Sequence, residues 1–551
     1  MNAILDALPA DTDVLVVGSG AAGLVAALGA ATAGAQVLVI DAGRRFGGTT
    51  ALGGGRIWIP VNGTPANRGD SIEAAASYLN QIFDTRYQEM IDAFLANGPR
   101  MKDFVETASS YRFVPCDNYP DYLQHLDGAT TGGRALDAVP VALADLVPEA
   151  AHTLIPPGYL PITHAEWEEW RYPAAYDWEL IRQRERTGIR TGGPGLVSAL
   201  LDGAIRAGAR LIADTELVDL DFDETGALAG ARLRRDGAET TIAVGAVVLA
   251  SGGYDANPEL RASLLPEALG ASAAAPTNTG VALRIAERHN LATDNLGQGW
   301  WMPMMFVPGD TIDGEPFPRA LVRERGVPHQ IMVNQAGERF VDESTPYNEF
   351  GKAVHRQTED GGLPNRHPFI VFDEDFRQHY SLPGLLATGA LPDNVVTAPT
   401  VAQLAARISV DPEALARTID RWNRFCRDGH DLDFQRGENA YDRYYGDQSL
   451  DGNRNLGPVT RGPFYAARVY SGTIGSKGGP VTTTHGQVLR YDGTPVGGLY
   501  AAGNAAAFWT GDGYPGPGAT LAVGMTFGHL AGMAAAGYLA KSPHSHPRHL
   551  T

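Results

Sequence analysis

The chain has 551 residues, which is too long for one ordinary hydrophobic core, so we expect at least two domains. Its formal net charge of −19 repels phosphate backbones and anionic lipid, which argues against binding to nucleic acid or to a membrane surface. The two cysteines, Cys116 and Cys426, have no metal-ligand spacing, so we expect free thiols, no metal site and a reducing cytoplasm.

The stretch from Asp13 to Asp41 has the pattern of a dinucleotide site. An apolar strand leads into the turn GSGAAG, and a small-residue helix and a second strand follow and end at Asp41. In such a turn Gly18 permits the tight bend, Gly20 lets backbone approach a pyrophosphate, and Gly23 lets the helix pack on the strand. The phosphates then face the helix N-terminus and Asp41 takes a ribose hydroxyl. FAD is favoured over NAD because the motif begins so close to the N-terminus.

The same stretch has two simpler explanations. A glycine turn in another strand–helix unit is one, but the strand before, the helix after and the final acid all fit a nucleotide site. A membrane span is the other, because Leu15–Ile40 carries no charged residue. This run is mostly Ala and Gly, is interrupted by Gln36, and follows an acidic flank where an anchor has a basic one. We therefore expect no transmembrane segment.

Three segments follow Asp41 before the next run of regular helix and strand patterns. The glycine-dense stretch Arg44–Gly55 can bring backbone N–H groups against phosphate or flavin, although a flexible surface loop explains it equally well. From Asp70 to Ser110 the pattern is helical, and Asp70 with Glu73 suggests a capping box. The segment Val147–Arg190 is rich in Pro, Trp and Tyr and poorly periodic, which indicates an inserted lid or a covering arm.

The middle of the chain returns to regular patterns. We predict a helix from Gly192 to about Ala207, then strands within Ala209–Leu220 and Ala227–Arg235 that belong to the nucleotide domain. An apolar strand then runs into the glycine turn of Ala246–Tyr254.

A change of composition marks a second domain. From about Gln298 to Asn455 aromatics and Met become frequent, with a strand at Gln330–Val333 and helices capped near Thr400 and Asp411. The last hundred residues return to glycine-punctuated apolar strands. We therefore predict an α/β fold with a discontinuous Rossmann-like FAD-binding domain (residues 1–296 and 456–551) and an inserted α+β catalytic domain (residues 297–455).

Four further motifs carry a family resemblance. They are FVDESTPY at 340–347, GSKGG at 475–479, GLYAAGN at 498–504 and YPGPGAT at 514–520. With GSGAAG and Asp41 they resemble, over essentially the whole chain, the fumarate reductase-like flavoproteins, and within that group the 3-ketosteroid Δ1-dehydrogenases. The resemblance implies non-covalent FAD, since the histidine-bearing motif of covalent relatives is absent. It also implies that the helix opening at Ala519 points its N-terminus at the flavin ring.

The residues expected to contact FAD come from several distant segments. They are Gly18, Gly20, Ala21, Ala22, Gly23, Asp41, Ala42, Gly48, Thr49, Thr50, Gly54, Gly55, Leu217, Ser251, Gly252, Gly503, Asn504, Gly518, Thr520 and Leu521.

The implied chemistry removes two hydrogens next to a ketone. It requires a base for the α proton, donors for the enolate oxygen, and a hydride acceptor, which flavin N5 supplies. The resemblance assigns the base to Tyr347, a hydroxyl that activates it to Tyr122, and the two donors to the Tyr514 side chain and the Gly518 backbone. A single tyrosine taken alone is better explained as a packing residue. The YPGPG segment favours function for Tyr514 and Gly518, and the polar motif around Tyr347 favours function there. Tyr119 could exchange roles with Tyr122.

The leading activity is therefore C1–C2 desaturation of a 3-ketosteroid, as in steroid degradation, with electrons passed to an acceptor that is quinone-like or artificial. A Δ4-type ketosteroid dehydrogenase or a dehydrogenase of an oxocyclohexane carboxylate is the alternative. A fumarate-type reductase needs cations that clamp a dicarboxylate, and Arg323, Arg325 and His329 offer the sole candidates; a flavin-binding scaffold without activity would lack the tyrosines. Lys477 is expected to be a surface or hinge charge. The Val147–Arg190 arm and the bulky Trp300–Met302 are expected to shape the ketone pocket.

Overall fold

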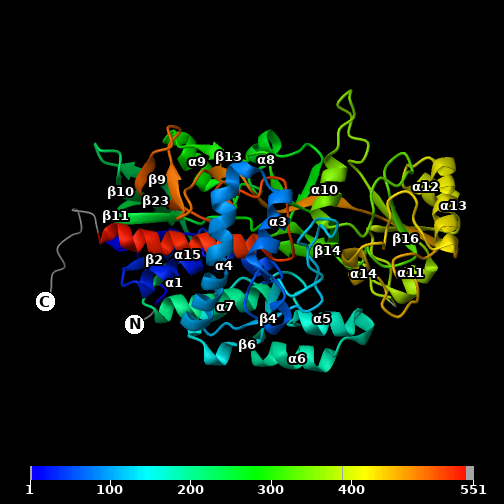
Figure 1. The fold of residues 1–551 in the computed structure, drawn as a ribbon, viewed down its shortest axis with the longest axis horizontal. Helices are drawn as coiled ribbons and strands as arrows, with labels where there is room; N and C mark the ends of the chain where they lie inside the picture. Colours follow the sequence, from blue (N-terminus) through cyan, green and yellow to red (C-terminus); the bar gives the residue numbers. More distant parts are fainter. Residues whose placement is uncertain (1–2, 6, 388, 541–551) are drawn as a thin grey trace.

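The computed structural model describes residues 3–5, 7–387 and 389–540, and its eight-stranded sheet lies toward one end of the molecule, at the left in Figure 1. The strand order is β22–β23–β11–β1–β2–β8; the strands from β23 to β8 are parallel, and β10 and β9 extend β11 in antiparallel fashion. The strands are β1 (Asp11–Val17), β2 (Val37–Ile40), β8 (Arg210–Ile212), β9 (Thr215–Phe222), β10 (Leu228–Arg235), β11 (Ala238–Leu249), β22 (Gln487–Leu489) and β23 (Pro495–Ala501). Both ends of the chain thus contribute to one sheet.

Apolar side chains cover both faces of this sheet. Val14 and Val16 of β1 point to the core beneath α1 (Ala21–Thr32), α7 (Gly192–Arg206) and α15 (Ala519–Leu539), whereas Leu15 and Val17 point to the core on the opposite face. This alternation follows from the two-residue period of a strand. The burial of both faces explains why β1 reads as an unbroken apolar run.

Helix α15 packs on α1 at unusually close range. A Cβ atom added at Gly528 would lie 2.4 Å from the carbonyl oxygen of Ala22, and one at Gly532 would lie 2.2 Å from that of Ala26. Helix α15 is long and apolar enough to cross a membrane by length and composition, but 61% of its most apolar window is buried inside the protein. A helix of this kind in the core of the fold satisfies the same test.

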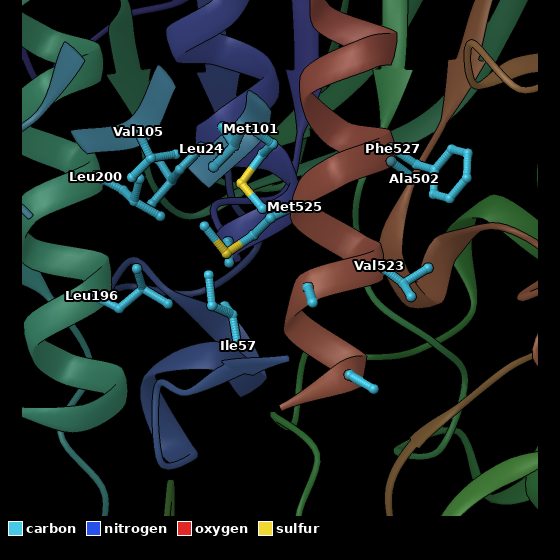
Figure 2. Packing of buried hydrophobic residues seen from close by; sticks show 14 of the residues in the cluster. Leu24, Ile57, Met101, Val105, Leu196, Leu200, Ala502, Val523, Met525 and Phe527 are labelled. Carbon is cyan, nitrogen blue, oxygen red and sulfur yellow. The ribbon is translucent and has the colours of Figure 1, made fainter. Parts of the chain in front are cut away.

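Side chains fill the space on both sides of α15, as Figure 2 shows. Met525 points toward Leu24 of α1 and Met101 of α4 (Gln88–Ala108), with Leu200 of α7 beside them, while Phe527 lies on the other side of the helix. All of these side chains belong to one buried cluster. The start of α15 is therefore held by packing and is not free to move independently of α1.

Two smaller sheets lie outside this sheet, with β14 near the middle of the view and β16 at the end opposite β10 and β11 (Figure 1). One has the order β12 (Leu269–Ser272), β20 (Tyr470–Ser476), β14 (Gly299–Ile312) and β15 (Glu315–Ala320). The other has the order β16 (Gln330–Val333), β17 (Phe369–Phe372), β19 (Phe464–Arg468) and β18 (Val395–Ala398). The helices here are α10 (Tyr347–His355), α11 (Glu374–His379), α12 (Val401–Arg407), α13 (Pro412–Asp428) and α14 (Ala440–Tyr445). The predicted strand at β16 and the predicted caps Thr400 and Asp411 are confirmed.

The other helices and strands connect these parts. They are α2 (Gly48–Leu52), α8 (Pro258–Leu264), α9 (Val281–Arg288), β3 (Ile57–Trp58), β4 (Phe113–Pro115), β5 (Ala135–Ala138), β6 (Val141–Ala142), β7 (Ile189–Arg190), β13 (Thr293–Asp294) and β21 (Gly479–Pro480).

One local prediction is wrong. Helix α3 (Ile72–Ile82) is capped by Ser71, whose Oγ accepts the Ala74 N–H at 3.1 Å, and not by a box of Asp70 and Glu73. Asp70 instead binds the buried guanidinium of Arg134 at 2.6 Å. The arm at 147–190 contains two helices, α5 (His164–Trp170), with a capping box, and α6 (Trp178–Thr187).

Candidate active site

A cavity of about 1020 Å³ lies where the parallel strands β1, β2 and β11 end and where α1 and α15 begin. Such a position, at the carboxyl ends of the strands, is where open α/β sheets bind ligands. Every residue predicted to contact FAD lines this cavity except Gly23. Gly23 lies behind the turn, where a Cβ atom would be 2.0 Å from the Gly18 carbonyl oxygen, so it serves the packing of helix on strand.

The N-termini of α1 and α15 open on this cavity. Gly20 precedes α1 and Gly518 precedes α15; these N-cap glycines offer no side chain, and neither helix has an acidic residue in its first turn. In α1 the Ala21 N–H donates to Thr50 Oγ1 at 3.0 Å. The first N–H groups of a helix have no partner within the helix and favour negative charge. The buried hydroxyl of Ser251, also in the wall, has no hydrogen-bond partner in the described part of the chain. These features fit FAD, whose pyrophosphate and hydroxyl groups would satisfy them.

Asp41 borders the cavity and also fixes the glycine turn. One oxygen of its carboxylate accepts the backbone N–H of Ser19 at 2.9 Å and the Ser19 hydroxyl, and the other accepts the Gly43 N–H at 2.8 Å. The Ser19 Oγ in turn accepts the Gly47 N–H at 2.8 Å. Burial raises the pKa of Asp41, although these bonds oppose the effect. This serine link between the turn and the glycine-dense loop was not predicted.

Three buried tyrosines meet at the other end of the cavity. The Tyr122 hydroxyl donates to that of Tyr347, and the Tyr347 hydroxyl donates to that of Tyr514 at 3.1 Å. The ring centroids of these three pairs lie 5.0–5.3 Å apart. Tyr347 and Tyr514 line the cavity, and Tyr122 lies behind them. Tyr119 has a different partner, the Tyr445 hydroxyl, so Tyr122 is the residue that contacts Tyr347.

Burial dominates the electrostatics of this cluster. It raises the pKa of Tyr347 well above 10, and the hydrogen bond from Tyr122 opposes this only in part. Burial also raises the pKa of Tyr122 well above 10 and that of Tyr514 to about 12. All three phenols are therefore neutral near pH 7, and each can donate a hydrogen bond.

The YPGPG segment positions Tyr514 and the start of α15. Gly518 has a left-handed φ of +98°, and a Cβ atom there would lie 2.6 Å from the Arg56 carbonyl oxygen, so only glycine fits. The Tyr122 N–H donates to the Pro515 carbonyl at 3.0 Å and ties the two tyrosine segments together. The Gly518 N–H makes no hydrogen bond with any residue that the structure describes, which leaves it free for a ligand.

The prediction that Lys477 is a surface or hinge charge is wrong. The side chain is fully buried, and its Nζ donates to the carbonyls of Gly511 and Gly513, both at 2.7 Å. The ammonium also lies 3.7 Å from the ring centroid of Trp300, whose edge packs on Tyr514. Burial lowers its pKa well below 10.5. Lys477 thus holds the backbone that leads into Tyr514.

Other parts of the wall were predicted only loosely or not at all. The arm at 147–190 contributes Pro156–Tyr159 to the wall. Of the Trp300–Met302 group only Met302 lines the cavity, and Trp301 packs on His355. Arg56 lines the cavity and was not predicted, because it follows a glycine run that resembles a simple loop.

The fold and the site define the class of protein as a flavoprotein oxidoreductase. The chain matches the FAD binding domain family over residues 13–521 and belongs to it. It is 37% identical over 536 residues to the 4-oxocyclohexanecarboxylate 2-dehydrogenase of Sinomonas cyclohexanicum, covering 96% of this chain and 93% of that protein. It is 35% identical over 568 residues to the 3-oxosteroid 1-dehydrogenase of Mycobacterium tuberculosis, covering 95% and 97%.

A solved structure agrees. The chain matches the crystal structure of 3-ketosteroid delta1-dehydrogenase from Sterolibacterium denitrificans in complex with 1,4-androstadiene-3,17-dione, with a TM-score of 0.89, 30% identity, and coverage of 96% of this chain and 100% of that chain. The protein is thus an FAD-dependent oxidoreductase that acts on CH–CH groups, similar to the 3-oxosteroid 1-dehydrogenases.

Proposed function

We propose that the chain catalyses the α,β-dehydrogenation of a ring ketone, with C1–C2 desaturation of a 3-ketosteroid as the leading reaction. The observation that carries this proposal is the connected set Tyr122, Tyr347 and Tyr514 beside the free Gly518 N–H. The names of the M. tuberculosis and S. denitrificans relatives support the same reaction.

Each residue of this set has a distinct task. The Tyr514 hydroxyl and the Gly518 N–H hold the ketone oxygen and make the neighbouring C–H acidic. Tyr347 takes the α proton, and Tyr122 donates to the Tyr347 oxygen, which offsets the cost of burying a charge there. Bound FAD supplies the acceptor for the hydride that leaves the β carbon. The N-termini of α1 and α15 would hold the cofactor in place.

The test is a product assay. The purified protein is incubated with a panel of 3-ketosteroids and an artificial electron acceptor, and products are followed by mass. The proposal predicts a loss of two hydrogens and a rate roughly 10²–10³-fold lower in Tyr514→Phe. A panel that yields no dehydrogenated product, from steroids or from simpler ring ketones, would overturn it.

A dehydrogenase of an oxocyclohexane carboxylate is the second candidate, because the same tyrosines serve a smaller ring and because Arg56 lies in the wall. The name of the S. cyclohexanicum relative supports it. A fumarate-type reductase is not supported, since Arg323, Arg325 and His329 do not line the cavity. The guanidinium groups of Arg323 and Arg325 instead bind backbone carbonyls.

We also infer the division into an FAD-binding domain, residues 1–296 and 456–551, and an inserted catalytic domain, residues 297–455. Two buried clusters, around Phe350 and Trp422, draw most of their residues from 297–455 and support it, and both extend into residues 456–469. Cys116 and Cys426 are free thiols, which supports a reducing cytoplasm.

A further inference from the structure

Arg56 is the arginine of the cavity wall that lacks a polar partner. The other arginines of the wall each bind a protein group: Arg234 binds Glu239, Arg284 binds Thr279, Arg288 binds Asp219 and Arg319 binds Asp310. Arg56 makes no hydrogen bond or ion pair with the residues that the structure describes, and its Nε is buried without a partner. A guanidinium is always charged and carries five donors; Arg56 is half-buried, and none of these donors, the buried Nε–H included, has a partner among the described residues.

The surroundings of Arg56 place it at the tyrosine end of the cavity. Its guanidinium lies 5.9 Å from the ring centroid of Tyr119 and close over Gly54, where an added Cβ atom would be 3.3 Å from Nη1. Its own carbonyl oxygen abuts Gly518, which supplies the proposed oxyanion N–H. The charge of the buried Asp137 carboxylate helps to raise the pKa of Arg56, but this carboxylate forms no ion pair with Arg56 and accepts the His164 N–H at 2.6 Å.

We propose that Arg56 binds a carboxylate carried by the ring of the ketone, so that the preferred substrates are carboxylated ring ketones. The inference rests on the proposed dehydrogenation and, within it, favours the second candidate, an oxocyclohexane carboxylate, over a 3-ketosteroid. A planar guanidinium with free donors matches a carboxylate in two-bond geometry. The pyrophosphate of FAD is expected at the other end of the cavity, on the first turn of α1, so the cofactor does not account for this cation. A ketone without a carboxylate leaves Arg56 unpaired and binds less well.

The experiment compares two ketones that differ in charge, 4-oxocyclohexanecarboxylate and its methyl ester, on the FAD-loaded protein. The variants are Arg56→Gln and Arg56→Lys, with Arg68→Gln as the matched control, because Arg68 is an exposed arginine outside the cavity. Steady-state KM and kcat are measured for both ketones, together with FAD content. Calorimetry measures the binding of cyclohexanecarboxylate, which lacks the ketone and does not react.

We expect Arg56→Gln to raise KM for the acid, and the dissociation constant of cyclohexanecarboxylate, on the order of 10- to 100-fold. The kcat for the acid, both constants for the ester, and FAD content should remain near wild type. Arg56→Lys should restore part of the binding, because it keeps the charge but loses the planar fork. Arg68→Gln should change nothing.

Three results would overturn the inference. An unchanged KM for the acid in Arg56→Gln would remove the carboxylate contact. An equal loss for acid and ester would assign Arg56 to the scaffold, and a loss of FAD would assign it to the cofactor. If wild type converts neither ketone, the proposed reaction fails on these rings, and the calorimetric comparison of wild type with Arg56→Gln still decides whether Arg56 binds a carboxylate.

Discussion

Changing Tyr122 to phenylalanine removes one hydroxyl and keeps the ring that packs against Tyr347 and Tyr514. That hydroxyl donates to Tyr347 and lies behind the cavity wall, so FAD binding should not change. A neutral hydrogen bond contributes about 1 kcal/mol, and one to a charged acceptor about 1.5–3 kcal/mol. The bond therefore stabilises the ionised Tyr347 over the neutral form by about 1–2 kcal/mol, which corresponds to a turnover roughly 5- to 30-fold slower.

The assay is steady-state turnover of a ring ketone with an artificial acceptor for Tyr122→Phe, Tyr347→Phe and the double variant. Loss of a positioned base typically costs about 10²–10⁴-fold, so Tyr347→Phe should be much slower than Tyr122→Phe. The double variant should be no slower than Tyr347→Phe alone, because Tyr122 acts only through Tyr347. A fully active Tyr122→Phe protein would refute this reasoning. So would a double variant whose turnover is reduced by the two single-variant factors multiplied together.

Three further predictions concern pH and backbone geometry. Burial raises the pKa of Tyr347 well above 10, so kcat/KM should rise with pH without a plateau below about pH 10; a plateau near neutrality would contradict this. Burial lowers the pKa of His355 from 6.5 to about 4, so the unfolded chain binds the extra proton first and stability falls as pH drops through this window, by up to about 3 kcal/mol. The unfolding midpoint should therefore fall further between pH 7 and pH 5 in wild type than in His355→Gln. Gly518→Ala should slow turnover on the order of 10²-fold and lower the melting temperature, because its Cβ would meet the Arg56 carbonyl; wild-type rates would exclude a strict need for this φ.

Local motifs could be predicted where neighbouring residues determine them. The GSGAAG turn, Asp41 and the caps Thr400 and Asp411 depend on short spacings, and the structure has each in its expected place. Pairs that are distant in sequence could not be found this way. The sequence predicted Asp70 as part of a helix cap, but its carboxylate forms a salt bridge with Arg134, which lies far along the chain.

The tyrosine cluster shows a second limit. Tyr122, Tyr347 and Tyr514 lie on separate loops and helix starts, and no periodicity connects them, so a family resemblance was needed to group them. Lys477 was placed wrongly for a different reason. Lysine is seldom buried, so the residue type predicted a surface position, whereas two backbone carbonyls and the Trp300 ring hold Lys477 inside.

The most direct test of the account is an anaerobic mixing experiment with the FAD-loaded protein and a ring ketone. Flavin absorbance is followed for wild type and for Tyr347→Phe at equal FAD content, with the 3-hydroxy analogue of the same ketone as control. We predict that the ketone bleaches the wild-type absorbance, that the hydroxy analogue does not, and that Tyr347→Phe bleaches at least about 10²-fold more slowly. Bleaching of Tyr347→Phe at the wild-type rate, or bleaching of wild type by the hydroxy analogue, would contradict the claim that Tyr347 removes a proton next to a polarised ketone.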